Sequence, residues 1–88
     1  MSRRRVAVTG LGIVSPVGTG VPEAWQAILA GKSGITRISR CDSAAFSSQI
    51  AGEVKGFDPA QHLSAKEARR FDTFIHYGLA ASIEAIKD

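Results

Sequence analysis

The fold is decided by a stretch close to the start of the 88-residue chain: Arg5-Val6-Ala7-Val8-Thr9-Gly10-Leu11-Gly12-Ile13-Val14-Ser15-Pro16-Val17-Gly18. It begins as a continuous apolar run. A short valine-rich run bounded by glycine and proline is typical of a strand buried on both faces. Such a strand needs neighbouring strands on both edges and helices over both faces. Pro16 has no N–H to give to a sheet ladder, so we expect the strand to end before it.

Two glycines, Gly10 and Gly12, interrupt this run. Because neither has a Cβ, another backbone can pass close to the chain at both positions. Glycines after a strand also suggest a dinucleotide-binding turn. That motif requires a third glycine where Ser15 stands, and Pro16 interrupts the helix that should follow. Close backbone packing is therefore the favoured interpretation, with a nucleotide-binding enzyme as the alternative.

The composition is that of an ordinary globular chain, with 44% apolar and 22% charged residues. The set of elements is less ordinary, because the sequence offers one convincing strand, a weaker second one and two or three helices. A two-stranded sheet is marginal in water. The last helical pattern runs to Asp88 without a glycine stop signal. We therefore expect an α/β fold that is incomplete on its own, the N-terminal part of something larger.

The net charge of +3 is concentrated in two clusters, residues 3–5 and the group Lys66, Arg69 and Arg70. Such clusters suggest acidic partners. Cys41 is the only cysteine, so no internal disulfide can form, which fits a reducing compartment such as the cytoplasm. Three arginines before a short apolar run match an export signal only loosely, and no run is long enough to span a membrane.

After the strand, the sequence predicts a helix from Pro22 to a stop at Gly31, packed through Trp25, Ile28 and Leu29. Residues 32–48 have no sustained period and predict a long irregular connection with a small apolar plug, formed by Ile35, Ile38 and Phe46. Residues 49–54 have weak strand character. Asp58 followed by Pro59 is a helix-start signature, for a helix of about one turn.

Residues 64–67 form a capping box, and a helical pattern follows to the end of the chain. Its apolar face comprises Phe71, Phe74, Ile75, Gly78, Leu79, Ser82, Ile83 and Ile86. Lys66, Arg69 and Arg70 lie at positions i, i+3 and i+4, opposite this face if the helix is continuous. Asp72 could instead restart a second helix after a kink. Either version leaves the three cations near each other.

These three cations are the best functional candidate from the residues alone, against the alternative of a solvated helix face. The patch is small and has no interleaved aromatic residue, which favours an acidic protein surface over nucleic acid. Cys41, His62 and His76 show neither a metal-ligand spacing nor a nucleophile–base arrangement, so we expect no metal and no cofactor. Structural or solvated roles are the default for all three.

Several separated motifs resemble, in order, the β-ketoacyl-[acyl-carrier-protein] synthases, the condensing enzymes of fatty acid synthesis, and among them the bacterial elongating synthase II group. They are residues 8–18, Trp25, residues 29–35, Phe57, residues 64–72, residues 74–75 and residues 77–78. The resemblance covers residues 4–88. It implies the N-terminal part of a thiolase-like αβαβα layered sandwich, in an enzyme that is usually a homodimer.

The resemblance also implies a reaction. An acyl group moves from acyl carrier protein to a cysteine thiolate, malonyl-carrier protein is decarboxylated, and the resulting carbanion attacks the acyl-enzyme. None of the family's catalytic residues matches a position here, so the chain should be inactive alone. The family's positive carrier-protein docking segment aligns with Lys66, Arg69 and Arg70. No nucleic acid or membrane partner is implied.

Three hypotheses result: a segment of a condensing acyltransferase, a free-standing module whose basic helix binds an acidic protein, or the start of a nucleotide-binding enzyme. The first requires a later cysteine on a buried helix and two later histidines. The second requires an independently folding 88-residue chain. The third requires a second strand that ends in an acidic residue.

Overall fold

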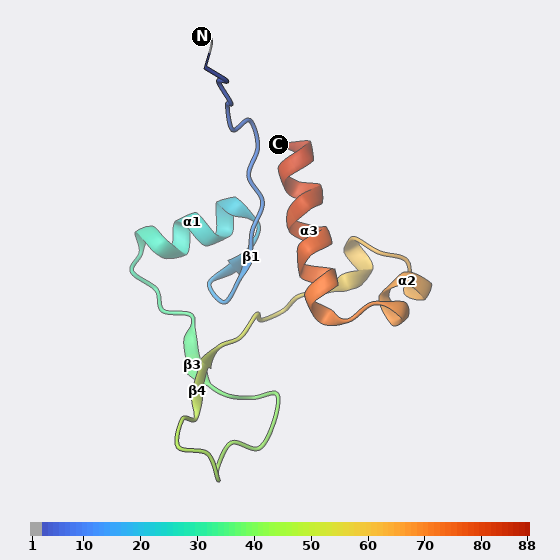
Figure 1. The fold of residues 1–88 in the computed structure, drawn as a ribbon. Coiled ribbons are helices and arrows are strands. Elements are labelled where there is room, and N and C mark those ends of the chain that lie inside the picture. Colours follow the sequence, from blue (N-terminus) through green and yellow to red (C-terminus); the bar gives the residue numbers. More distant parts are fainter. Residues whose placement is uncertain (1–2) are drawn as a thin grey trace.

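The computed structural model describes residues 3–88, in which an extended N-terminal segment passes into a short hairpin and lies between two of the three helices (Figure 1). The elements, in order, are β1 (Val14–Ser15), β2 (Gly18–Thr19), α1 (Val21–Leu29), β3 (Ile35–Arg37), β4 (Ile50–Gly52), the 3₁₀ turn η1 (Pro59–Gln61), α2 (Ala65–Arg70) and α3 (Thr73–Lys87). They form two separate two-stranded antiparallel sheets, β1–β2 and β3–β4.

The predicted N-terminal strand is wrong for most of its length. Residues 3–13 take part in no sheet ladder, and Val6 and Val8 are 90% and 78% exposed. Only β1 pairs, with Val14 opposite Thr19 in a tight hairpin. The physical reason is that the other strands of the described chain pair with one another, so the apolar run has no edge neighbour. The strand does end before Pro16, as predicted.

The two glycines pack closely against α3, which confirms the favoured interpretation of them. A Cβ added to Gly12 would overlap the Ala81 carbonyl oxygen, and one added to Gly10 would overlap that of Ala85. Figure 1 shows the N-terminal segment passing between α1 and α3. The expected helices over both faces are therefore found only near Gly10 and Gly12, because residues 3–9 are exposed.

Glu84 on α3 joins three parts of the chain. Its carboxylate accepts hydrogen bonds from the backbone N–H of Ile13 at 2.9 Å and of Val21 at 2.8 Å. Val21 is the first residue of α1, and the residue before it, Gly20 with a φ of 99°, has no side chain that could cap the helix. Glu84 therefore supplies from another element the acceptor that an N-cap side chain would ordinarily provide.

The end of α1 matches the sequence prediction, but its packing does not. Gly31, with a φ of 69°, follows the helix, and the N–H groups of Gly31 and Lys32 bond back to the carbonyls of Ile28 and Ala27. This is the glycine stop of a Schellman motif.

The three side chains through which α1 was predicted to pack are more than half exposed: Trp25, Ile28 and Leu29. Ala24 is the buried residue of α1, and its backbone nitrogen lies close to Gly18 of β2.

The connection at residues 32–48 is less irregular than predicted, because it contains β3. Ile35 pairs with Gly52 and Arg37 with Ile50, which confirms the weak second strand. The predicted plug of Ile35, Ile38 and Phe46 is wrong: Ile35 and Phe46 are 54% and 57% exposed and Ile38 is half-buried. The hairpin instead packs on Pro16, whose ring lies against the backbone of Gly34 and Gly52.

The helical pattern after residue 64 divides into two helices, as in the kinked version of the prediction. Ser64 caps α2, its Oγ accepting from Glu67 N–H at 3.2 Å, while Phe71 is extended and Asp72 is the N-cap residue of α3. Asp favours such helix starts over helix interiors. The one-turn prediction at Asp58 is confirmed by η1, where Asp58 Oδ1 accepts from Ala60 N–H at 3.0 Å.

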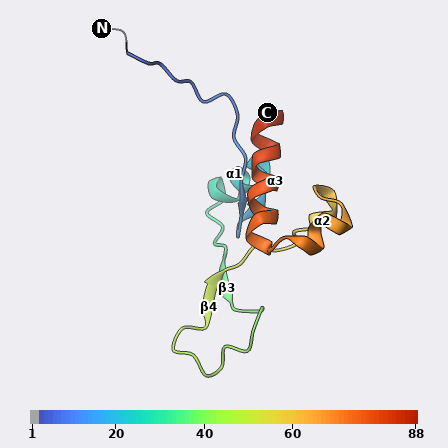
Figure 2. The same ribbon diagram turned by 45° about the vertical axis from the view of Figure 1, so that its right-hand side comes forward.

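The arrangement is open. The radius of gyration is 16.5 Å, whereas a compact domain of this length has about 12 Å. Figures 1 and 2 both show the β3–β4 hairpin projecting away from the helices. Among residues 3–88, Ala24 and Ala80 are the buried apolar residues, and Phe74 and Ile86 on the apolar face of α3 are 71% and 84% exposed. The described chain thus has layers without a closed core.

None of its helices is long and apolar enough to cross a membrane.

The close approach at Gly12 predicts that Gly12→Ala lowers the free energy of unfolding by about 1–3 kcal/mol, because α3 must move away from an overlapping Cβ. Urea denaturation of the complete gene product measures the change. Gln26→Ala, an exposed substitution on α1, is the control and should stay within about 0.5 kcal/mol of the parent. A Gly12→Ala protein as stable as the parent would contradict the packing.

Because Glu84 accepts two hydrogen bonds, we predict a graded loss of stability in two variants at this position. Glu84→Ala leaves two part-buried N–H groups without their acceptor and should cost about 2–3 kcal/mol of unfolding free energy. Glu84→Gln retains one carbonyl oxygen and should cost about half as much. Thermal or urea denaturation of both variants gives the comparison, and equal stability of the two would show that hydrogen bonding at this position is not what joins the elements.

Candidate functional site

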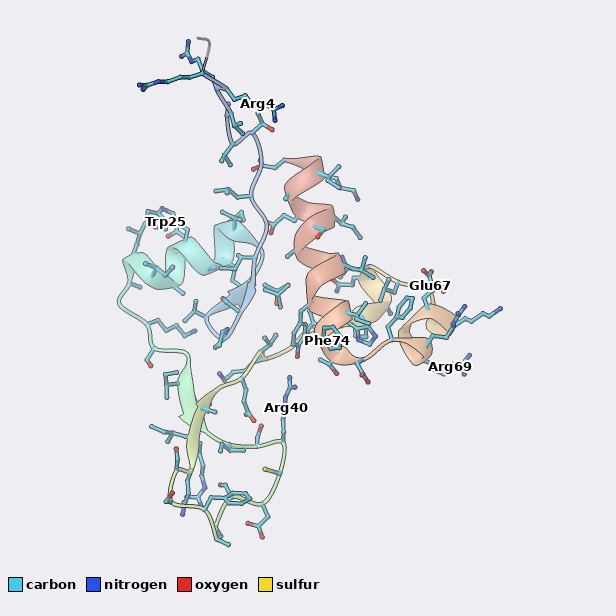
Figure 3. All side chains as sticks on the ribbon, viewed as in Figure 1. Arg4, Trp25, Arg40, Glu67, Arg69 and Phe74 are labelled. Atoms are coloured by element: carbon cyan, nitrogen blue, oxygen red, sulfur yellow. The ribbon has the colours of Figure 1, made fainter. Side chains whose placement is uncertain are left out.

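The candidate site is the basic patch, which we define as Lys66, Arg69 and Arg70. All three residues lie on α2 and are exposed, so the sequence prediction that they stay together is confirmed. Figure 3 shows the Arg69 side chain directed away from α3. The neighbouring acid, Glu67, accepts a hydrogen bond from the Ser64 hydroxyl at 3.0 Å. Its carboxylate is therefore engaged at the helix start.

Because α2 and α3 are separate helices, the patch does not lie opposite the apolar face of one continuous helix. That version of the prediction is wrong. The extended backbone of Phe71, with φ −111° and ψ 143°, separates the two helices. The direction in which the patch faces is therefore set by how α2 is attached to α3 and not by helical periodicity.

Two consecutive residues of α3 make that attachment. His76 Nε2 lies 2.9 Å from the carbonyl oxygen of Ala68 on α2. The ring of Tyr77 meets that of Phe57 edge to face, with centroids 5.0 Å apart, and Phe57 also stacks on His62 at 5.8 Å. Edge-to-face and offset-stacked arrangements are the favoured geometries of ring pairs. The segment before α2 and α2 itself are thus both in contact with the first turns of α3.

Arg40 lies beside this aromatic group, although it is 37 residues away from Tyr77. Its Nη2 donates to the Tyr77 hydroxyl oxygen at 2.6 Å and to the Val54 carbonyl at 3.5 Å. The hydrogen bond to Tyr77 raises the pKa of the Arg40 guanidinium above its ordinary value. The two side chains form part of an open hollow of about 410 Å³, with Phe57, Thr73 and His76 also in its wall.

The carboxylate of Glu53 organises the loop that carries Arg40. It accepts from the Ser39 hydroxyl at 2.8 Å, from Ser39 N–H at 3.1 Å and from Arg40 N–H at 3.3 Å. The Ser39 hydroxyl is the main reason why the pKa of Glu53 lies below its usual range, and both backbone N–H groups act in the same direction. The loop is therefore held by an ionised carboxylate.

The other residues considered from sequence are not brought together into a reactive group. Cys41 is a free, exposed thiol. His62 is half-buried in the ring stack with Phe57, and His76 is hydrogen-bonded, which agrees with structural roles for both. The Gly10–Gly12 turn does not form a phosphate cradle, because the N–H groups of Leu11 and Ile13 bond to the carboxylates of Asp88 and Glu84.

Sequence reasoning missed the residues that fix the site from a distance, namely Glu84, Arg40 and Tyr77. The only available signal for Glu84 was a glycine before a helix start, which leaves the N-terminal N–H groups without a local acceptor. Nothing in the sequence pairs Arg40 with Tyr77. Their hydrogen bond exists because the β3–β4 hairpin brings residue 40 back to the start of α3.

The chain matches a known protein family over nearly its whole length. The profile of the family described as "Beta-ketoacyl synthase, N-terminal domain" matches residues 3–88. The chain belongs to this family. The resemblance drawn from the separated sequence motifs is thereby confirmed, and the nucleotide-binding alternative is wrong.

Similar proteins carry related names. The chain is 54% identical over 88 residues to 3-oxoacyl-[acyl-carrier-protein] synthase 2 of Vibrio cholerae, and 48% identical to the protein of that name from Coxiella burnetii. Both alignments cover 100% of this chain and 21% of the relative, so the chain spans about a fifth of their length. A solved structure, the ishigamide ketosynthase/chain length factor, superimposes with a TM-score of 0.82 at 35% identity, over 98% of this chain and 21% of that one.

These comparisons confirm the predicted fold class. The strands and helices of the described chain match the N-terminal part of a ketosynthase, an α/β thiolase-like protein. They also agree with the absence of a closed core, because the superposition involves only a fifth of the neighbouring chain. A layered sandwich distributes its core over more elements than these.

The lowered pKa of Glu53 can be tested directly by NMR titration of its side-chain carboxyl. Ser39→Ala should raise the pKa of Glu53 towards its ordinary value, because the largest stabilising hydrogen bond of the carboxylate is lost. A group with a lowered folded-state pKa contributes stability above its unfolded pKa and loses it as pH falls through the folded value. The parent should therefore retain its loop contacts to lower pH than Ser39→Ala.

Ser47→Ala, at an exposed serine in the same connection, is the matched control and should leave the Glu53 titration unchanged. A Glu53 pKa that does not respond to Ser39→Ala would contradict the assigned cause.

Proposed function

We propose that this chain is the N-terminal portion of a 3-oxoacyl-[acyl-carrier-protein] synthase, an acyltransferase that elongates fatty acyl chains. The single observation that carries the proposal is the 54% identity to the Vibrio cholerae synthase over all 88 residues. The motifs at residues 8–18 and 64–72 lie within the aligned residues and agree with it.

In the proposed reaction, an acyl thioester of acyl carrier protein transfers its acyl group to a cysteine thiolate and releases the carrier thiol. Malonyl-carrier protein then loses CO₂, and the carbanion attacks the acyl-enzyme to give the 3-oxoacyl product and free the thiolate. Cys41, His62 and His76 match none of the family's catalytic positions. We therefore assign catalysis to residues outside this segment and expect the 88-residue chain to be inactive alone.

The proposed contribution of this segment is a packed layer and a docking surface. Exposed apolar side chains on α1 and α3 support a role in packing against the remainder of the synthase: Trp25, Ile28, Leu29, Phe74 and Ile86. The relatives' names include acyl carrier protein. Resemblance to the family further supports a cytoplasmic homodimer that needs no cofactor or metal, and the single Cys41 fits a reducing compartment.

The basic patch is the proposed docking surface for acyl carrier protein. Three exposed cations on two turns of one helix offer a compact positive surface to an acidic partner. Such charges act mainly on the rate of encounter and on selection of the partner, and they weaken with ionic strength. The engagement of Glu67 by Ser64 supports the same role, since the carboxylate of the acid nearest to the patch already has a hydrogen-bond partner within the helix start.

The activity is tested with the complete gene product, purified and supplied with acyl- and malonyl-loaded carrier protein. We expect formation of a 3-oxoacyl-carrier protein with release of one CO₂ per product, detected by mass spectrometry and by labelled CO₂. A complete, folded gene product that performs neither step would overturn the proposed function.

The docking surface is tested by the double charge reversal Arg69→Glu/Arg70→Glu in the complete enzyme. We expect the KM for carrier-protein substrates to rise roughly tenfold at low salt, because attraction becomes repulsion, with a smaller rise at high salt. Steady-state kinetics over a series of ionic strengths measures both.

The matched control is Lys32→Glu/Arg37→Glu, which makes the same change in net charge at two exposed cations outside α2. It should leave the KM within about twofold of the parent. Equal effects of the two double variants would show that only the overall charge matters, and unchanged kinetics in both would remove the basic patch from the docking surface.

A further inference from the structure

A helix of six residues cannot fix its own direction. Isolated helices shorter than about 12–15 residues are marginal in water, and α2 spans only Ala65–Arg70. Its Ser64 cap stabilises the first turn without attaching the helix to anything else. Figures 1 and 2 show α2 at the edge of the molecule, beside the start of α3. The direction of α2 must come from side chains that cross between the two helices.

His76 makes such a contact with a backbone group. Its Nε2 is 2.9 Å from the Ala68 carbonyl oxygen, in a part-buried position. A carbonyl only accepts hydrogen bonds, so this distance places the ring proton on Nε2. Ala68 lies in the last turn of α2, where carbonyls have no partner within the helix. The bond therefore satisfies a free acceptor at the end of α2 that carries Arg69 and Arg70.

A second contact lies next to the first along α3. Tyr77 packs its ring edge to face on Phe57, ahead of η1, and receives a hydrogen bond from Arg40 on its hydroxyl. The segment from Phe57 to Arg70 is thus held near both of its ends by neighbouring residues of α3. Of these two contacts, only that of His76 reaches α2 itself, so it acts most directly on the orientation of the basic patch.

We propose that His76 is a positioning residue for docking of the carrier protein, and that it acts through the Ala68 carbonyl on the direction of the basic patch. This inference rests on the proposed function, because it concerns the same docking surface. All three cations belong to one short helix, so a rotation of α2 moves them together relative to the rest of the enzyme. Electrostatic docking depends on the register of such charges with those of the partner.

The test uses the complete enzyme and two acyl donors, acyl-carrier protein and the small thioester acyl-pantetheine, in the acyl-transfer half-reaction. His76→Leu removes the donor, and His76→Asn has a side chain too short to reach Ala68. We expect both to raise the KM for acyl-carrier protein roughly two- to tenfold. The kcat, and both constants for acyl-pantetheine, should stay within twofold of the parent.

His76→Gln is the matched control, because its amide retains a donor at similar reach and should restore most of the parent KM. A general structural defect would instead lower kcat for both donors and would not be rescued by glutamine. If His76→Leu does not fold, His76→Asn supplies the comparison.

The outcomes separate the two proposals. An equal rise in KM for both acyl donors would overturn the positioning role. So would a KM for acyl-carrier protein in His76→Gln as high as that in His76→Leu. A raised KM in Arg69→Glu/Arg70→Glu together with an unchanged KM in His76→Leu and His76→Asn would overturn the role of His76 alone. An unchanged KM in the double charge reversal would overturn the docking surface itself.

Discussion

The carboxylate of Glu84 is the interaction on which the arrangement depends. It accepts from Ile13 in the N-terminal segment and from Val21 at the start of α1, so one side chain of α3 fixes two other parts of the chain. Gly20 has no side chain with which to cap α1, and the negative charge of Glu84 lies at the positive end of that helix. Removing this side chain would take the acceptor from α1 and from the N-terminal segment at the same time.

That interaction is possible only because α3 comes unusually close to the chain. Gly10 and Gly12 leave no Cβ between the extended backbone and the carbonyls of Ala81 and Ala85. The side of α3 that contacts the rest of the described chain is therefore the one with small and acidic residues. Its apolar side, with Phe74 and Ile86, stays exposed. A layer arranged in this way can continue on both sides, which suits the multilayered thiolase-like fold that the comparisons show.

The orientation of α3 also governs the candidate docking surface. The first turns of α3 carry His76 and Tyr77, which contact the segment that ends in α2. The same helix thus places the N-terminal segment through Glu84 and the basic patch through His76. A short helix at the periphery obtains a defined direction from a longer one whose own position is fixed by a charged hydrogen bond and two glycines.

The sequence by itself determined the local features and the family. Ser64, Asp58 and Gly31 act within a few residues of their own position, so their capping roles could be predicted, and the cluster of Lys66, Arg69 and Arg70 follows from helical spacing. The tertiary structure alone decided which faces are covered. Trp25 and Ile28 are exposed and Ala24 is buried, because burial depends on the elements that arrive from elsewhere in the chain. The partners of Glu84, Arg40 and His76 were likewise undetermined, because contacts across 71, 37 and 8 residues need the fold that brings them together.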